Sequence, residues 1–385
     1  MKTEWVHKKL GDDDVAKIIM GQSPSSASYN DENIGLPFLQ GCADFGEVFP
    51  KTSVYCNEPL KVAPQNSILM SVRAPVGTIN KADQKYIIGR GLCSIVSLIN
   101  NDYLYYYLLQ NKNRLEQKAQ GSTFLAINSA EVNDFDVSYP ESLSTQRRIA
   151  AILNSADKVI AATQKTIAKY KQIKQGMMED LLNEQCTMNN VQWRKVKLGE
   201  VGKISMCKRV FSFETSTESE IPFYKIGTFG KDADAFISRQ LYEEYKSKFS
   251  YPKVGDILIS ASGTIGRTVV YDGEPAYFQD SNIIWIDNNE TIVLNQFLYY
   301  QYQIISWNLE SSTIARLYND NFNRIEITIP DLAEQRRIAA ILSGIDAKIA
   351  AEEKVLQKYE KVKKGLMEKL LNEQCKRKEM KKTEI

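Results

Sequence analysis

The sequence predicts an α+β protein with a pseudo-twofold internal repeat, in which two β-rich mixed domains are joined by two long antiparallel coiled-coil helices. Three observations support this prediction. One stretch of the chain recurs about half a chain length later, both copies carry the apolar spacing of an amphipathic helix, and the regions between them hold short strand-like runs punctuated by glycine and proline. A chain of 385 residues also exceeds one typical core.

The repeat is the clearest feature of the chain. Residues 145–186 and 334–375 are identical at 25 of 42 positions without a gap, at an offset of 189 residues. Outside these segments the two halves match only in outline. The repeat divides the chain into a first domain at 1–143, a repeated helix at 144–186, a second domain at 187–332, a repeated helix at 333–376 and a basic tail at 377–385.

The repeated segments are predicted to be helices. The first contains no proline, and its apolar residues follow one another at alternating steps of three and four. Pro140 and Pro330 lie just upstream, where a helix has not yet begun. A helix of about 38 residues is about 57 Å long, too long to bury its apolar stripe within one domain. We therefore expect the two copies to pack against each other as an antiparallel pair. The stripe is wider than a strict coiled-coil seam, which indicates a further partner helix, and a plain dimerisation coiled coil is the alternative.

The two domains are predicted to be β-rich, with one helix each. The expected helices lie near Tyr103–Gln120 and Leu294–Leu309. Core packing is the favoured interpretation of the tyrosine run at Tyr103–Tyr107, ahead of base stacking. The expected strands are Ser67–Val72, Ile87–Ile88, Ser94–Leu98, Asp256–Ser260, Thr268–Tyr271 and Asn282–Ile286.

Composition indicates an ordinary cytoplasmic protein. Hydrophobic residues make up 43% of the chain and charged residues 25%, no apolar run approaches the length of a membrane span, and the start lacks the order of a signal peptide. The six cysteines form no CxxC pair and the one histidine is His7, so we expect reduced thiols and no metal site. The net charge of +2 indicates no particular partner.

Motifs for chemistry are missing. There is no phosphate-binding loop, no dinucleotide fingerprint and no HExxH sequence, and His7 alone could serve a Ser-His or Cys-His arrangement. We expect no catalytic site and no cofactor in this chain. A nuclease built from scattered carboxylates stays open as an alternative.

The candidate DNA contacts lie in loops that occur in both halves. Small hydroxyl residues and glycines let a backbone approach phosphates closely, and arginine or an amide can reach a base edge. A glycine-bearing hairpin turn is the alternative for the loops near Gly77 and Gly266. The candidate DNA-binding residues are Ser71, Arg73, Gly77, Thr78, Arg90, Ser122, Thr123, Asn128, Ser260, Ser262, Gly263, Thr264, Arg267, Gln279, Asn282, Thr313, Arg316 and Asn319.

These features resemble the specificity subunit of type I restriction–modification systems. The resemblance covers essentially the whole chain and rests on Pro140 followed by Ser144–Ala150, on Pro330 followed by Leu332–Ala339, and on Gly255–Ser260 with Gly266. It implies two target-recognition domains that each read one half of a bipartite, asymmetric DNA sequence, with the paired helices as a spacer. It also implies two methyltransferase subunits that flip out and methylate an adenine. Restriction subunits, when present, would cleave unmodified DNA, and S-adenosylmethionine, ATP and magnesium would be held by partner subunits.

The resemblance also implies which residues bind the other subunits, and where the first domain departs from the pattern. Arg73-Ala74-Pro75 replaces a loop of small residues there, and Asn66-Ser67 replaces Gly255-Asp256. A coiled-coil adaptor that binds proteins but not DNA is the second alternative, and the loop arginines argue against it. The expected subunit-binding residues are Gln146, Arg147, Arg148, Ile149, Ile160, Tyr170, Gln335, Arg336, Arg337, Ile338, Ile349 and Tyr359.

Overall fold

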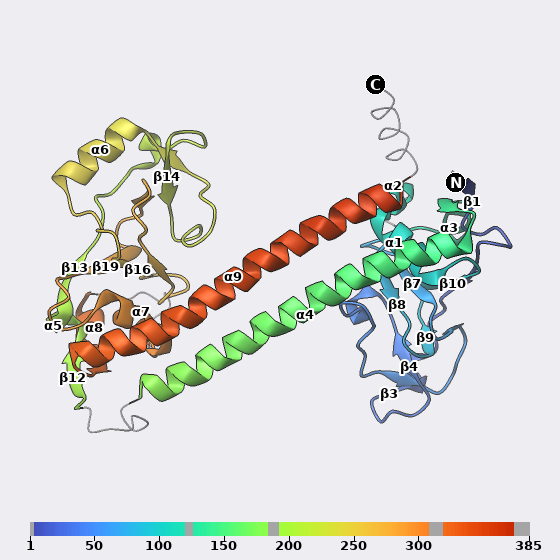
Figure 1. Cartoon of the computed structure of the whole chain (residues 1–385), viewed down its shortest axis with the longest axis horizontal. Coiled ribbons are helices and arrows are strands. Elements are labelled where there is room, and N and C mark those ends of the chain that lie inside the picture. Colours follow the sequence, from blue (N-terminus) through green and yellow to red (C-terminus); the bar gives the residue numbers. More distant parts are fainter. Residues whose placement is uncertain (1–3, 120–125, 184–191, 308–318, 373–385) are drawn as a thin grey trace. The chain divides into compact units, whose positions relative to one another are not determined.

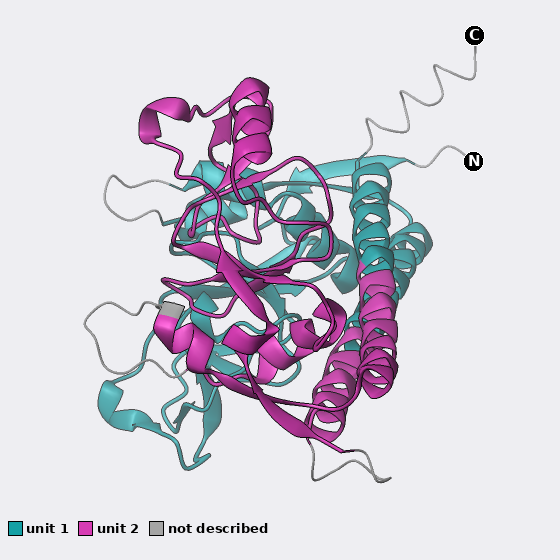
Figure 2. Cartoon of the chain, turned by 90° about the vertical axis from the view of Figure 1, so that its left-hand side faces the viewer, with its two compact units in different colours: residues 1–165, 354–385 teal, residues 166–353 magenta. Residues whose placement is uncertain are grey.

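The computed structural model describes residues 4–119, 126–183, 192–307 and 319–372. It separates into two compact units (Figure 2): residues 1–165 with 354–385 form unit 1, and residues 166–353 form unit 2. The long helices α4 (Leu143–Leu181) and α9 (Leu332–Leu370) each have 39 residues (Figure 1), and both contribute to both units (Figure 2). The prediction of two long helices is therefore confirmed, and each unit contains the first part of one helix and the last part of the other.

Unit 1 is built on three small sheets. An antiparallel four-stranded sheet has the order β2-β10-β7-β8, a mixed five-stranded sheet has the order β3-β5-β4-β9-β6, and β1 pairs with β11. The strands are β1 (Trp5–Lys9), β2 (Ala16–Met20), β3 (Tyr29–Asn30), β4 (Leu36–Leu39), β5 (Tyr55–Cys56), β6 (Val62–Ala63), β7 (Ile68–Ser71), β8 (Ile79–Lys81), β9 (Tyr86–Ile88), β10 (Leu92–Ser97) and β11 (Asp136–Pro140). The helices are α1 (Asn101–Gln110), α2 (Lys112–Lys118) and α3 (Ser129–Asn133).

Unit 2 repeats this plan. Its antiparallel four-stranded sheet has the order β13-β19-β16-β17, a three-stranded sheet has the order β15-β14-β18, and β12 pairs with β20. The pair β14–β18 is parallel, as is β4–β9 in unit 1. The strands are β12 (Arg194–Lys197), β13 (Gly202–Ser205), β14 (Ile221–Tyr224), β15 (Phe236–Ile237), β16 (Ile257–Ser260), β17 (Thr268–Val270), β18 (Tyr277–Phe278), β19 (Ile283–Asn288) and β20 (Glu326–Ile329). The helices are α5 (Leu198–Val201), α6 (Arg239–Lys248), α7 (Asn295–Ile304) and α8 (Asn319–Arg324).

The prediction of one helix per domain is wrong in both units. In unit 1 the expected helix is broken at Asn111, whose side-chain amide donates to the carbonyl of Tyr107 at 2.8 Å and competes with the helical hydrogen bonds. In unit 2 the helix α6, which begins after Ser238, is not among the expected elements. The Ser238 hydroxyl accepts a hydrogen bond from the backbone N–H of Leu241 at 3.2 Å and caps the helix.

The core of each unit includes both long helices. The positions involved are the same in the two copies of the repeat. Unit 1 buries Ile149 and Leu153 from α4 with Met367 and Leu371 from the end of α9. Unit 2 buries Ile338 and Leu342 from α9 with Met178 and Leu182 from the end of α4. The wide apolar stripe thus serves the domain cores as well as the other helix, and a further partner helix stays a prediction.

Candidate nucleic-acid interface

The hairpin loops after β7 and β16 have the same internal support. In unit 1, Ser71 donates its hydroxyl to the Pro75 carbonyl at 2.5 Å and accepts from the Thr78 N–H at 2.8 Å. In unit 2, Ser260 donates to the Thr264 carbonyl at 2.5 Å and accepts from the Arg267 N–H at 2.9 Å. Both serines are 1% exposed, so they hold the loops in shape and present no hydroxyl at the surface.

Glycine is required where these loops turn back. Gly77 has φ +76° and Gly266 has φ +81°, a region that side chains with a Cβ rarely adopt. A Cβ at Gly266 would lie 2.2 Å from Nε1 of Trp307, whereas a Cβ at Gly77 would lie 3.1 Å from Cβ of Leu115. The two glycines therefore shape the base of each loop, and unit 2 tolerates less at this position than unit 1.

The departure of the first domain from the family pattern at Asn66 leaves the conformation of the turn unchanged. Asn66 stands where unit 2 has Gly255, and both residues have positive φ, at +67° and +92°. Asparagine is among the residues that adopt this conformation most readily. The turn before β7 is therefore the same as the turn before β16, in spite of the different residues.

Two arginines of unit 1 meet at one depression of about 290 Å³. Arg73 from the hairpin loop and Arg90 from the loop after β9 are both exposed. The two loops are joined because the Val72 N–H donates to the Gly91 carbonyl at 2.9 Å. Within the described residues neither guanidinium forms an ion pair, so both are available to a phosphate or a base edge. The remaining lining is Ser23, Gln40, Gly41, Cys42, Ala43, Ala74 and Gly91.

The corresponding loops of unit 2 are joined by the same backbone hydrogen bond, from the Ala261 N–H to the Asn282 carbonyl at 2.8 Å, and also by side chains. Ser262 donates to Oδ1 of Asn282 at 2.8 Å, and Oε1 of Gln279 accepts from the Ile226 N–H at 3.0 Å. Arg267 donates from Nη1 to the Phe229 carbonyl at 2.9 Å. The tip residues Gly263 and Thr264 are exposed.

The third pair of candidate loops is described only in part. Asn128 caps α3: its Oδ1 accepts from the Glu131 N–H at 3.0 Å, and its own N–H donates to Glu131 at 2.8 Å. Asn319 is the first residue of α8. Ser122, Thr123, Thr313 and Arg316 lie outside the described residues.

The expected subunit-binding residues fall into an inward group and an outward group. Gln146 and Gln335 are buried, and each donates a hydrogen bond to the proline carbonyl that precedes its helix. Gln146 donates to Pro140 at 2.8 Å, and Gln335 donates to Pro330 at 2.9 Å. Their Oε1 atoms accept from the N–H of Asn100 and of Leu294, both at 2.9 Å. We therefore reassign both glutamines to holding the chain's own domains, together with Ile149, Ile338 and Ile349, which are also buried.

The outward group consists mainly of arginines at the start of each long helix. Arg147, Arg148 and Arg336 are exposed, and Arg337 forms a two-pronged pair with Glu334, with a shortest distance of 2.5 Å. This pair lowers the pKa of the Glu334 carboxyl. Of the aromatic and aliphatic candidates, Tyr359 is exposed, and Ile160 and Tyr170 are half-buried.

A triad of side chains in unit 1 joins the domain to both long helices. Tyr106 on α1 donates its hydroxyl to Asp157 on α4 at 2.6 Å, and Lys363 on α9 pairs with the same carboxylate at 2.5 Å. Burial, the larger cause, and the Asp157 carboxylate raise the pKa of Tyr106, so the phenol is a fixed donor. A polar contact of this kind specifies how far one helix is displaced along the other.

Unit 2 contains the same triad at the equivalent positions. Tyr300 on α7 donates to Asp346 on α9 at 2.8 Å, and Lys174 on α4 pairs with that carboxylate at 2.8 Å. Lys171 pairs with Glu353 at 2.8 Å. From the first pair to the second, the residue numbers fall on α4 and rise on α9. The antiparallel pairing of the helices is therefore confirmed inside this unit.

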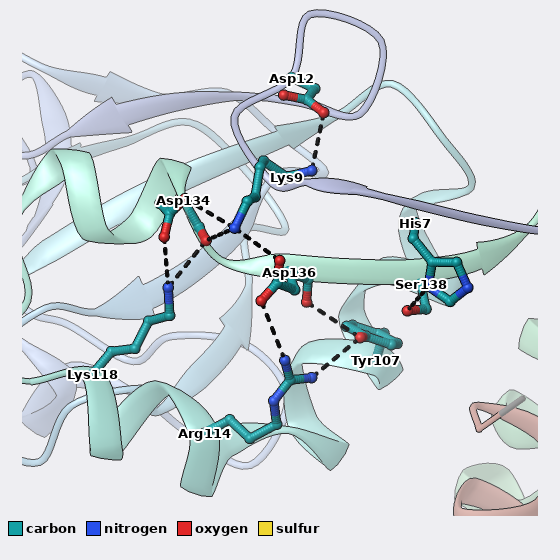
Figure 3. Close-up of polar contacts among 9 residues, drawn as sticks. All are labelled: His7, Lys9, Asp12, Tyr107, Arg114, Lys118, Asp134, Asp136 and Ser138. Carbon is teal, nitrogen blue, oxygen red and sulfur yellow. Dashed lines mark hydrogen bonds and ion pairs between the residues drawn. The ribbon is translucent and has the colours of Figure 1, made fainter. Parts of the chain in front are cut away.

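A cluster of charged side chains in unit 1 pairs internally (Figure 3). Lys9 on β1 contacts Asp134 at 2.9 Å and Asp136 at 2.8 Å, Lys118 contacts Asp134 at 3.0 Å, and Arg114 lies 3.8 Å from Asp136. Hydrogen bonds from Lys9 are the main reason that the pKa values of both carboxyls are lowered. The cations of this cluster are already paired with carboxylates of the same unit, so we assign the cluster to stabilising the fold of unit 1.

The lone histidine lies beside the same cluster (Figure 3). Nδ1 of His7 is 2.8 Å from the hydroxyl of Ser138, which is its direct cross-strand partner in the β1–β11 ladder. In the part of the chain that the structure describes, no three His, Cys, Asp or Glu side chains are grouped to hold a metal ion. No helix in that part has the length and apolar character to cross a membrane.

Two duplicated units that present unlike polar loops on one scaffold define a repeated recognition module. The family described as type I restriction modification DNA specificity domain matches residues 2–173 and again 190–361, and the chain belongs to this family. It is 47% identical over 261 residues to a Haemophilus influenzae protein described as a type I restriction enzyme specificity subunit, covering 64% of this chain and 65% of that one. A Methanocaldococcus jannaschii protein with the same kind of description is 41% identical over 182 residues, or 46% of this chain and 43% of the relative. Each match thus spans less than two thirds of the relative.

Solved structures support the fold. The S subunit of a type I restriction–modification system from M. genitalium superposes with a TM-score of 0.66 at 18% identity, over 97% of both chains. A chain from a study of complex assembly and conformational transition of the type I system superposes with a TM-score of 0.60 at 17% identity, over 97% of this chain and 99% of that one. The predicted fold class is therefore confirmed.

Proposed function

We propose that each unit reads one half of a bipartite, asymmetric DNA sequence, and that the chain directs catalytic partners to that sequence without catalysis of its own. The observation that carries the proposal is the combination of one scaffold with two sets of loop side chains. Ser71 and Ser260 support the two hairpins with the same hydrogen bonds. The side chains around them differ, because unit 1 presents Arg73 and Arg90 whereas unit 2 presents Ser262 bonded to Asn282. Two readers that share the same loop support and differ at their contact residues suit a site with two different halves.

The contact chemistry differs accordingly between the units. Arg73 and Arg90 suit phosphate oxygens or the O6 and N7 atoms of guanine, which an arginine bonds through two N–H groups. The amides of Gln279 and Asn282 suit adenine, and the exposed tip at Gly263 and Thr264 suits close approach of the backbone to a phosphate. We therefore expect unit 1 to depend more on charge and salt concentration than unit 2.

The catalytic partners are two methyltransferase subunits, which methylate an adenine in each half-site, and restriction subunits that cleave unmodified DNA with ATP. The outward arginines Arg147, Arg148 and Arg336, together with Tyr359, are the residues we assign to docking them. S-adenosylmethionine, ATP and magnesium belong to those partners. The paired helices serve as the spacer that determines how many base pairs separate the two half-sites.

Binding to a panel of duplexes tests this proposal. The chain is purified with its methyltransferase partner, and a randomised duplex pool is selected on the complex. We expect one bipartite motif, and we expect the chain alone, incubated with DNA, magnesium and S-adenosylmethionine, to neither cleave nor methylate. Selection of no motif would contradict sequence reading, and turnover by the isolated chain would favour the nuclease alternative. A complex that binds no DNA at all would favour the adaptor alternative.

A further inference from the structure

One segment of unit 2, residues 206–214, exposes two phenylalanines that lie outside the candidate loops. It follows β13 and ends in a single turn at Ser212–Glu214. Phe213 is 83% exposed and Phe211 is 49% exposed. Their rings stack with centroids 5.6 Å apart and planes within 7° of parallel. A stacked aromatic pair in water leaves apolar surface uncovered, which is unfavourable unless something covers it in the working complex.

The pair is held outward by a braced turn. Glu214 accepts from the Phe211 N–H at 2.8 Å and, with its other oxygen, from the Tyr245 hydroxyl at 3.1 Å. The Thr215 hydroxyl donates to the Ser212 carbonyl at 2.9 Å and closes the turn. The two rings are therefore already ordered before binding, so binding requires no rearrangement of this turn.

The chemistry beside the pair is that of a nucleic-acid contact. Lys208 and Arg209 immediately precede it and are exposed. Arg209 pairs with Asp280 at 3.0 Å, and Asp280 lies between the candidate residues Gln279 and Asn282. The segment is thus continuous with the candidate interface of unit 2. Apolar side chains flanked by cations suit insertion between base pairs, because the rings cover the unstacked base faces while the cations contact the phosphates.

We propose that Phe211 and Phe213 form an apolar wedge that enters a base-pair step of the half-site read by unit 2, with Lys208 on a flanking phosphate. Unit 1 has no such wedge at the equivalent turn, Ser26–Ser28, which is preceded by Ser23, Pro24 and Ser25. One half of the DNA site is therefore kinked and the other is not. This inference rests on the proposed function, since it assigns a DNA contact to the same interface.

The test uses the complete complex with its methyltransferase partner. A duplex carrying the selected motif is labelled with 2-aminopurine at successive steps across each half-site. We expect increased fluorescence at one step in the half read by unit 2, and loss of that signal in F213A together with roughly ten-fold weaker binding. F213W should retain the signal. The matched control is F49A, which removes a phenylalanine that is 46% exposed in unit 1 and should change neither quantity.

Each other outcome overturns the inference in a different way. An F213A complex with unchanged affinity and unchanged fluorescence would remove the wedge while leaving the proposed function intact. Loss of methyltransferase binding by F213A, measured by size-exclusion chromatography, would place the pair at a protein interface instead. A wild-type complex that binds all duplexes alike would overturn the proposed function and the wedge together.

Discussion

Unit 1 and unit 2 agree wherever the repeated helices contact them, and differ wherever a loop tip reaches solvent. Both have the Tyr–Asp–Lys triad, at Tyr106 in unit 1 and Tyr300 in unit 2, with the same atoms in contact. In contrast, Arg73 of unit 1 is exposed at its loop, whereas the Arg267 side chain of unit 2 donates to the Phe229 carbonyl. The residues that support each loop are therefore separate from the residues that its tip presents. Contact residues are therefore free to change without loss of the scaffold.

The strongest test of this equivalence is to remove one core side chain from each unit. Leu153 and Leu342 occupy the same position of the repeat, and both are 0% exposed. We expect L153A and L342A each to lower the free energy of unfolding by about 3 kcal/mol, because each leaves a cavity in the core of its own unit. Urea unfolding followed by hydrogen exchange locates the loss. A large loss from one variant and none from the other would contradict the equivalence.

Substitution of the loop glycines is expected to destabilise the two units by different amounts. G266A places a Cβ 2.2 Å from Trp307, so we expect a loss of about 3 kcal/mol, whereas G77A should lose about 1–2 kcal/mol from backbone strain and mild crowding. Thermal unfolding measures both. The matched controls are G176A and G365A, at equivalent helical positions with open space around them, which should stabilise by up to about 1 kcal/mol. Equal losses from G77A and G266A would contradict the difference in loop packing.

Neutralising the triads is expected to cost less and to cost both units alike. D157N and D346N each remove the charge that a lysine of the opposite helix contacts, and we expect a loss of about 1 kcal/mol from each. K171A, which breaks the exposed pair with Glu353, is the control and should change stability by less than about 0.5 kcal/mol. Denaturant titration distinguishes these values, and a control as damaging as the triad variants would show that the triad has no special role.

Acid should affect the edge of unit 1 in a defined direction. The pKa values of Asp134 and Asp136 are lowered in the folded chain, so their contribution is present above the ordinary carboxyl pKa and is lost as pH falls through the lowered values. We expect faster amide exchange in β1 below about pH 4. D134N/D136N should remove that pH dependence. The β12–β20 pair of unit 2 is the internal reference, and an identical response there would assign the effect to general acid unfolding.

The sequence alone predicted the long helices because an apolar stripe repeated over many turns is typical of a helix, and it predicted their pairing because two copies occur in one chain. It also predicted most strands of the four-stranded sheets, whose apolar runs are bounded by glycine or proline. It did not predict the inward role of Ser71, Ser260 and Gln146, because a polar side chain has the same letter whether it faces a loop carbonyl or DNA. It missed Phe213 because exposure of one aromatic depends on the tertiary support at Glu214.

The most direct test of separate reading by the two units is to map methylated adenines in DNA modified by complexes that contain the wild-type chain or the R73A/R90A variant. We predict a bipartite motif for the wild type. For the variant we predict relaxed sequence preference in one half only, with the other half and the spacer unchanged. Relaxation of both halves, or an unchanged motif with unchanged affinity, would contradict the assignment of one unit to each half-site.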